Sequence, residues 1–231
     1  MHDQISMPER FAEWNEQMVA RHDPERFHDH PRTVVRWMES RRVRAVLRLL
    51  KADRDHALLD VGCGAGNLLL QVDAGARHGL DLSKKMVGRA RQRLGDQARI
   101  VHADAEQLPY ADATFDRVLC SSVLSHVLRP EKVLEESFRV LKPGGRLVLS
   151  VSYEVTIERG IRIARKLGLG PVLLGDGSPD EHVYNSEYHL HHFDARLLHE
   201  CAAKLPKPLL LRKIPWFWPT HLIAAYQKPE A

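Results

Sequence analysis

The chain has 231 residues, of which 44% are hydrophobic and 28% are charged, and its formal net charge is +4. These values are typical of a soluble globular protein with a sizeable core, built as one large domain or as a domain with a cap. No apolar run is long enough to span a bilayer, and the charged first residues contain no apolar leader segment. The mild basic charge fits ordinary solubility better than a specific anionic partner.

Three cysteines, Cys63, Cys120 and Cys201, lie far apart and next to apolar or small residues. Their odd number and their spacing favour free thiols in a reducing compartment over a disulfide framework. Together with the absence of a visible leader segment, they predict a cytoplasmic protein.

Strands and helices are expected to alternate through the middle of the chain. Residues 1–55 have helical patterns, and the apolar runs that follow predict five strands, at 57–61, 76–81, 98–104, 115–122 and 145–152. Between them, helices are expected at about 66–73, 83–94 and 130–141, with Ser83 as a helix N-cap. The motif KPGG at 142–145 is expected to end the crossover into the fifth strand. This order predicts βαβ units, with helices on both faces of a mostly parallel sheet.

Residues 154–193 interrupt this alternation, because they carry little periodicity and are rich in Gly, His and Tyr. A helix is then expected at 195–205, followed by apolar runs at 214–218 and 221–227. The short Pro-Thr break between the two runs predicts an antiparallel hairpin at the sheet edge, where prolines are tolerated. The expected fold is α/β: a doubly wound, mostly parallel seven-stranded sheet with helices on both faces and a C-terminal antiparallel hairpin.

The stretch LLDVGCGAGNLLL, at 58–70, places Gly62, Gly64 and Gly66 between the first strand and the next helix. The dinucleotide fingerprint G-x-G-x-x-G requires its third glycine at position 67, which is Asn67, and no G-K-[ST] follows. The turn therefore favours close approach of a ligand to the backbone without a bound pyrophosphate. The alternative is that the glycines serve only a tight turn.

Acidic residues follow two further strands at the edge where open α/β sheets bind ligands. Asp81 ends the second strand and is placed to accept hydrogen bonds from ribose hydroxyls, while Asp104 ends the third and could accept from an exocyclic amine. Such a site suits a nucleoside that carries a cation, and it disfavours NAD and ATP. As alternatives, Asp81 could stabilise a helix N-terminus and Asp104 could be a turn residue.

The ordered set LLDVGCGAGNLL, GLDLSKKMVGRAR, ADAEQLPYADATFDRVLC, VLSHV and ESFRVLKPGGRLVLSV covers nearly all of residues 57–151. This set resembles the class I S-adenosylmethionine (SAM)-dependent methyltransferases of the small-molecule, methyltransferase type 11-like family. The resemblance implies a Rossmann-like fold and SAM as cofactor. It also implies an N-terminal helical cap at 1–55, a SAM-binding core at 56–153, a substrate lid at 154–193, and a C-terminal helix and hairpin at 194–231 that complete the sheet.

The resemblance also implies roles for matching residues. Asp60 and the glycine turn would hold the methionyl part, Asp81 the ribose, and Met86 with Asp104 and the Ala105 amide the adenine, with Ser121 near the methionine. Met86 could instead be core, Ser121 structural and Cys63 inert packing. The expected cofactor-binding set is Asp60, Gly62, Cys63, Gly64, Gly66, Asp81, Leu82, Met86, Asp104, Ala105 and Ser121.

Nucleic-acid methylation is not expected. The fourth strand is followed by neither Asn-Pro-Pro-Tyr nor Pro-Cys, and the basic residues lack the aromatic interleaving of a single-strand binder. The acceptor is therefore expected to be a small molecule that receives a methyl group on an O, N or C atom. The alternatives are a non-catalytic SAM-binding regulatory subunit, and a methyltransferase for a lipid or macromolecule at an anionic surface. The sequence gives no signal for an oligomeric state.

The segment EHVYNSEYHLHHFD, at 181–194, is the expected source of a general base. The candidate catalytic residues are Tyr188, His189 and His192, which could remove a proton from an O–H or N–H acceptor. Packing or solvent exposure is the alternative. Although His189, His191 and His192 are close in sequence, no recognisable ligand set is complete, so no metal is expected. His126 is expected to have a packing role.

From Val34 to Lys51 the chain has six basic residues and one acidic residue, with apolar residues interleaved. We expect the apolar side of this helix to cap the sheet and its arginines to face water, without membrane contact. An anionic membrane surface and an arginine bound to an acidic substrate group are the alternatives.

Overall fold

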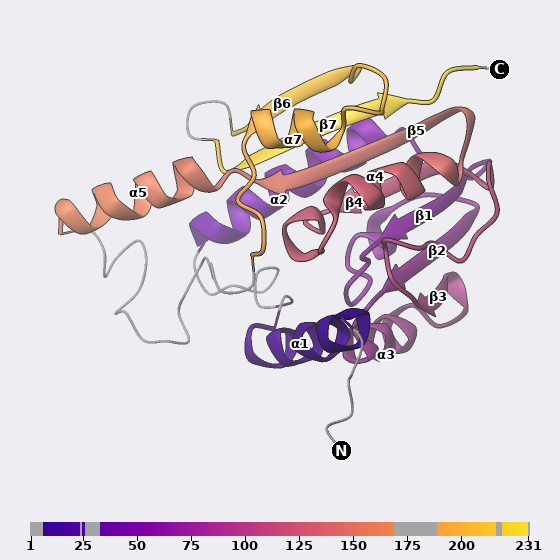
Figure 1. Cartoon of the computed structure of the whole chain (residues 1–231), viewed down its shortest axis with the longest axis horizontal. Coiled ribbons are helices and arrows are strands. Elements are labelled where there is room, and N and C mark those ends of the chain that lie inside the picture. The colour runs from indigo at the N-terminus through magenta and orange to yellow at the C-terminus, as the bar shows by residue number, and fades with distance from the viewer. Residues whose placement is uncertain (1–6, 24, 26–32, 169–188, 216–218, 231) are drawn as a thin grey trace.

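A seven-stranded sheet forms the centre of the computed structural model, which describes residues 7–23, 25, 33–168, 189–215 and 219–230 (Figure 1). The strand order is β3-β2-β1-β4-β5-β7-β6. The first five strands pair in parallel, and β7 pairs antiparallel with both β5 and β6. The expected fold class is therefore confirmed. The strands are β1 (Ala57–Val61), β2 (Ala76–Asp81), β3 (Arg99–His102), β4 (Phe115–Ser121), β5 (Leu141–Ser152), β6 (Leu210–Ile214) and β7 (His221–Gln227).

Helices cover both faces of the sheet, as Figure 1 shows for α2 and α4 on opposite sides of β5. The side chains of β5 alternate between two hydrophobic clusters: Leu147 and Leu149 pack with α4 and α7, and Val148 packs with α2 and α3. The helices are α1 (Met7–Arg21), α2 (Thr33–Leu50), α3 (Lys84–Leu94), α4 (Pro130–Arg139), α5 (Glu154–Lys166) and α7 (Ala195–Cys201).

The fold positions a ligand site at one place on the sheet edge. The chain runs outward from β1 through β2 to β3, and then returns to the other side of β1 with β4. This reversal between β1 and β4 is the topological switch point, where ligands bind beyond the carboxyl ends of the strands. The loops after β1, β2, β3 and β4 therefore meet there.

Two expectations for the parallel half are wrong in detail. The helix expected at about 66–73 is only a 3-10 turn, η2 (Leu69–Gln71), because Gly66 has a positive φ of 83° that helical residues do not adopt. The KPGG motif does not end the crossover before the strand, because β5 already begins at Leu141. The pairing of β5 with β4 is irregular there, so Pro143 is accommodated outside the regular ladder.

The C-terminal hairpin is shifted relative to its expected position. Its first strand, β6, ends at Ile214, where the sequence pattern predicted that it would begin, whereas β7 (His221–Gln227) matches the expected run. Pro215 cannot donate a hydrogen bond to the ladder, and the connection is closed by Thr220 N donating to Ile214 O at 3.0 Å. The helix expected at 195–205 also ends early, at Cys201.

The region expected to be irregular after β5 begins with a helix, α5 (Glu154–Lys166), so that expectation is wrong for its first part. Val155 and Ile163 lie on the exposed side of α5 together with basic residues, which hides the helical period in the sequence. Residues 169–188 lie outside the described residues. In the described parts of the chain, no helix is both long and apolar enough to cross a membrane.

Candidate functional site

The glycine turn after β1 depends on backbone conformations that favour glycine. Gly62, Gly64 and Gly66 have φ values of 68°, 54° and 83°. A Cβ atom on Gly62 would lie 2.3 Å from Val123 Cγ2, and one on Gly66 would lie 2.6 Å from Leu94 Cδ1. No atom lies within 4 Å of the corresponding position on Gly64. Two of the glycines therefore allow close packing inside the protein, while the third leaves space above the turn.

Asp81, at the end of β2, holds this turn in place. Its Oδ2 atom accepts a hydrogen bond from Gly64 N, and its Oδ1 atom accepts one from Ser83 N, both at 2.9 Å. Burial raises the pKa of the Asp81 carboxyl group, and these two hydrogen bonds oppose that rise. Because an ionised carboxylate offers about four acceptor positions, Asp81 can still accept from ligand hydroxyls.

Asp60 is a buried carboxylate at the same strand ends. Its side chain belongs to a residue only 2% exposed, and its Oδ2 atom has no hydrogen-bond partner among the described residues. Burial raises the pKa of Asp60 to about 8, the charge of Asp81 adds to the rise, and Arg42 opposes it. A buried acceptor without a donor is costly, so this atom is suited to a ligand that brings a donor or a positive charge.

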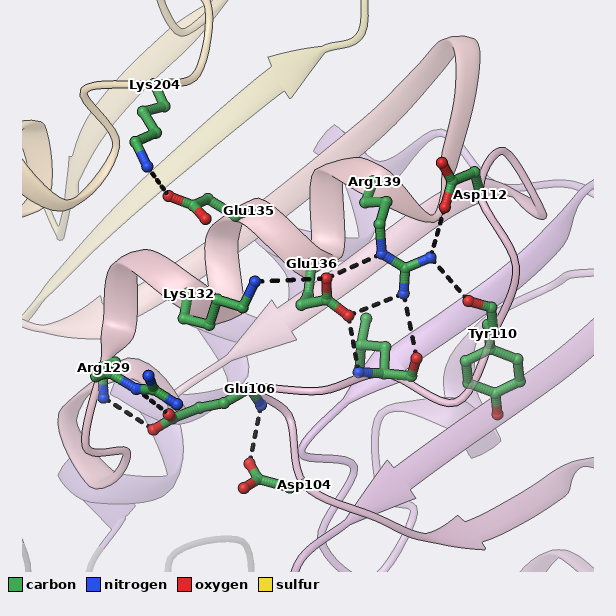
Figure 2. A network of polar contacts seen from close by, with 11 residues as sticks. Asp104, Glu106, Tyr110, Asp112, Arg129, Lys132, Glu135, Glu136, Arg139 and Lys204 are labelled. Atoms are coloured by element: carbon green, nitrogen blue, oxygen red, sulfur yellow. Dashed lines mark hydrogen bonds and ion pairs between the residues drawn. The ribbon is translucent and has the colours of Figure 1, made fainter. Parts of the chain in front are cut away.

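Asp104 and Ala105 follow β3 in a loop that is fastened from two sides. Asp104 Oδ1 accepts from Glu106 N at 2.8 Å, and both carboxylate oxygens of Glu106 accept from Arg129 (Figure 2). Burial raises the pKa of Asp104. Further along the loop, Glu136 Oε2 on α4 accepts from Leu108 N at 2.9 Å. These contacts join the loop to α4 and leave little freedom in the position of Asp104.

A cavity opens where these loops meet. Its wall includes the carboxylates of Asp81 and Asp104, and no lysine or arginine is among the described residues that line it. Residues from the loop after β4 form another side, and α1 contributes two residues that the sequence analysis did not select. The cavity is lined by Phe11, Asn15, Gly62, Leu80, Asp81, Leu82, Asp104, Ala105, Ser122, Val123, His126 and Val127.

Five residues of the expected cofactor set line this cavity, and six do not: Asp60, Cys63, Gly64, Gly66, Met86 and Ser121. Met86 is 1% exposed and packs in a small apolar cluster with Val19 and Ala65. Cys63 is buried in the turn, and burial raises its pKa. The Ser121 hydroxyl group forms a hydrogen bond with Ser150 Oγ at 2.8 Å, on the sheet face that α2 covers.

The structure places the histidine candidates His189 and His192 differently relative to the cavity. His189 lies beside His126, a cavity-lining residue, with 4.7 Å between the ring centroids. The neighbouring backbone is fixed to the same loop, because Leu190 N donates to Ser125 O at 2.7 Å. His192 is exposed and is not part of the cavity wall. Tyr188 lies outside the described residues.

Helix α2 corrects one expectation about its arginines. Arg36, Arg41, Arg44 and Arg48 are exposed as expected, but Arg42 is only 4% exposed. The Arg42 guanidinium forms hydrogen bonds with Glu39, Ser121 and Ser150. The signal was present in the helical period, because position 42 lies on the same side as the buried Val35, Val46 and Leu50.

Among the described residues, no three His, Cys, Asp or Glu side chains lie close enough together to hold a metal ion. The three cysteines are free, with Cys63 and Cys120 buried and Cys201 half-buried.

Residues 59–149 match the family model described as a methyltransferase domain. These residues, which are fewer than half of the chain, are similar to the domain that this family model describes. The match covers the part of the chain that holds the glycine turn and the carboxylates of Asp60, Asp81 and Asp104, so the family was correctly identified from the sequence motifs.

Curated relatives and a solved structure share this domain. A demethylmenaquinone methyltransferase of Clavibacter sepedonicus is 42% identical over 96 residues, which cover 40% of this chain and 39% of that protein. A 27-O-demethylrifamycin SV methyltransferase of Amycolatopsis mediterranei is 34% identical over 174 residues, covering 70% of this chain and 60% of that protein. The chain thus spans less than two thirds of the length of these relatives.

The solved structure of the N-methyltransferase NodS from Bradyrhizobium japonicum, in complex with S-adenosylhomocysteine (SAH), has the same fold. It matches with a TM-score of 0.64 and 20% identity, over 95% of this chain and 99% of that chain. This likeness extends beyond the matched domain to nearly the whole chain, and it confirms the Rossmann-like methyltransferase fold.

Proposed function

We propose that this chain is a SAM-dependent methyltransferase that transfers a methyl group to an O, N or C atom of a small-molecule acceptor. The cavity at the carboxyl ends of β1 to β4 carries this proposal, because it combines the glycine turn with the carboxylates of Asp81 and Asp104. A nucleotide phosphate would meet no cationic side chain among the described residues of its wall. A nucleoside with a positive charge and hydroxyl donors suits it better.

The surroundings of the Asp60 carboxyl group indicate whether the residues present fit SAM. Its buried Oδ2 atom has no partner among the described residues. The ammonium group of the methionyl part of SAM is a cationic donor of the kind that this atom requires. The residues therefore fit the cofactor, and Asp60 is the residue proposed to hold its methionyl end.

The other roles follow from the position of each residue around the cavity. Asp81 is proposed to accept from the ribose hydroxyls, and Asp104 with the Ala105 amide to contact the adenine edge. The space at the Cβ position of Gly64 is proposed to let the cofactor approach the backbone. When bound, SAM supplies an activated methyl group on a sulfonium, and the protein supplies orientation and a dry site.

His126 and His189 are the proposed proton acceptors on the acceptor side. His126 lines the cavity, and the ring of His189 lies beside the ring of His126. A proton that His126 removes from an O–H or N–H group of the methyl acceptor would therefore be shared between two imidazoles. Ser121 would act indirectly, because its hydroxyl group is bonded to Ser150 and Arg42.

A second candidate function is methylation of a lipid or macromolecule at an anionic surface. It is favoured by the exposed side of α2, which presents Arg36, Arg41, Arg44 and Arg48 together with Trp37 and lacks an exposed acidic residue between them. Such a surface can associate with anionic headgroups.

Transfer of a radioactive methyl group tests both candidates. The full chain is incubated with methyl-tritiated SAM and separate pools: small metabolites, demethylmenaquinone with 27-O-demethylrifamycin SV, and anionic vesicles. Label in a small-molecule pool supports the proposal, and label only with the vesicles favours the second candidate. Binding of SAH without transfer to any pool would favour the non-catalytic alternative, and no binding would contradict the cofactor assignment.

A further inference from the structure

The buried carboxylate of Glu106 joins two loops that both line the cavity. Glu106 is 5% exposed and directly follows Asp104 and Ala105, the cavity-lining residues of the loop after β3. Its Oε1 atom accepts from Arg129 N and its Oε2 atom accepts from Arg129 Nε, both at 2.8 Å (Figure 2). Arg129 comes two residues after Val127, a cavity-lining residue of the loop after β4. Glu106 thus connects the adjoining parts of the two loops.

The contact between Glu106 and Arg129 fixes the main chain as well as a side chain. Arg129 is the N-cap residue of α4, so its backbone N–H has no partner inside that helix. The Glu106 side chain is 6% exposed, and a buried carboxylate is costly unless donors surround it. The two bonds therefore satisfy both sides, and they hold the backbone at the end of the loop after β4.

Glu106 also fixes the Asp104 side chain. Glu106 N donates to Asp104 Oδ1 at 2.8 Å. Burial raises the pKa of the Asp104 carboxyl group, and the hydrogen bond from Glu106 N opposes that rise. The charges of Glu106 and Arg129 shift the pKa of Asp104 in opposite directions. The pair therefore holds Asp104 in place without adding a net charge beside it.

The loop after β4 is held at a second place by residues 189–193. Leu190 N donates to Ser125 O at 2.7 Å, and His191 Nε2 forms a hydrogen bond with Val127 O at 2.9 Å. Ser125 itself is only 2% exposed. Because this loop is fastened at both places, it offers Glu106 a fixed partner, and Glu106 relates the position of Asp104 to it.

We propose that Glu106 is a positioning residue that makes the cofactor site selective for a base with an exocyclic amine, by fixing the Asp104 carboxylate relative to the loop after β4. This inference rests on the proposed function, in which Asp104 contacts the adenine edge. An ionised carboxylate can only accept hydrogen bonds, so it favours a base that offers an N–H donor. The discrimination is strong only while the carboxylate cannot turn to another partner.

Calorimetry with SAH and with the SAH analogue whose purine carries hydrogen in place of the 6-amino group tests this role. The wild type should bind SAH about tenfold more tightly, because the analogue lacks a hydrogen bond to a charged group. In Glu106→Gln this ratio should fall at least about threefold, since the new amide group turns N–H donors toward those of Arg129. Arg129→Ala, which retains the bond from the backbone N–H, should lower the ratio by less. Glu135→Gln, which removes the ion pair of α4 with Lys204, is the matched control and should keep the wild-type ratio.

The ratio of the two affinities separates positioning from a merely structural role. A structural role would lower the melting temperature and weaken both ligands equally, so a wild-type ratio in folded Glu106→Gln and Arg129→Ala would overturn the inference. If Glu106→Gln does not fold, the ratio in Arg129→Ala decides. If the wild type binds both ligands equally, Asp104 does not read the amine and the inference fails, while the cofactor assignment stands. If the wild type binds no SAH, the proposed function itself fails.

Discussion

The Asp81 carboxylate accepts a hydrogen bond from Gly64 N at 2.9 Å, although Asp81 ends β2 and Gly64 lies in the turn after β1. This bond joins the end of β2 to the glycine turn after β1, across the switch point of the sheet. The Asp81 carboxylate thus fixes the shape of the turn and can also accept hydrogen bonds from a ligand. Substitution of Asp81 should affect the shape of the turn and the binding of a ligand differently.

Asp81→Asn should weaken SAH binding by at least about tenfold, because hydrogen bonds that involve a charged group contribute roughly 1.5–3 kcal/mol each. The asparagine amide keeps one oxygen that can still accept from a backbone N–H, so the fold should survive. Calorimetry measures the affinity, and Asp112→Asn on the exposed loop is the control. Unchanged affinity in a folded Asp81→Asn protein would remove the ribose role.

Asp60 predicts a pH dependence of stability. Its pKa is about 8 in the folded chain, against an ordinary value of about 3.9 in the unfolded chain. The folded state therefore binds more protons between these values, so the contribution of Asp60 to stability is fully present below pH 4 and is lost as pH rises to 8. Urea unfolding from pH 4 to pH 8 should show a smaller loss in Asp60→Asn than in the wild type. Equal losses would show that the carboxyl group titrates normally.

The protein should tolerate alanine differently at Gly62 and at Gly64, two glycines of the turn. A positive φ costs roughly 1–2 kcal/mol for an alanine at either Gly62 or Gly64. Only at Gly62 would the new Cβ also meet Val123, and overpacking adds about 1–3 kcal/mol. Gly62→Ala should therefore unfold at a lower urea concentration than Gly64→Ala. The reverse order would mean that the turn relaxes away from Val123.

His189 and His192 offer a matched pair on the acceptor side. His189 lies against the cavity-lining His126, whereas His192 is exposed. With an acceptor found in the methyl-transfer screen, His189→Asn should lower turnover, because it removes the imidazole beside the cavity-lining His126. His192→Asn should leave turnover unchanged. Wild-type turnover in both variants would exclude His189 from proton removal.

The bounds of β1 and β2 could be predicted closely from the sequence, whereas those of the edge strand β6 and of helix α5 could not. β1 and β2 begin and end as expected: β1 is a short buried run that a glycine turn follows, and β2 ends at Asp81, just before the Ser83 N-cap of α3. β6 was misplaced, since an edge strand with three exposed residues lacks the buried pattern that marks a strand. α5 was missed because Val155 and Ile163 face solvent.

The residues that line the cavity also differ in whether the sequence could predict them. Asp81 and Asp104 could be found because the carboxyl ends of parallel strands meet at one edge, and the motif gives their order. Phe11 and Asn15 could not, because they come from a helix that precedes the first strand and reaches the site only through packing on α3. The burial of Arg42 could have been predicted from the helical period, but its partners Ser121 and Ser150 could not, since they are distant in sequence.

Calorimetric titration of the purified full chain with SAH, alongside NADH, tests the central claim most directly. The cavity is lined by the carboxylates of Asp81 and Asp104, with no cationic side chain among the described lining residues, and the buried Asp60 Oδ2 atom at the end of β1 has no partner among the described residues. The account therefore predicts saturable binding of SAH at one site per chain, lost in Asp81→Ala, and no binding of NADH. Binding of NADH without binding of SAH would contradict it.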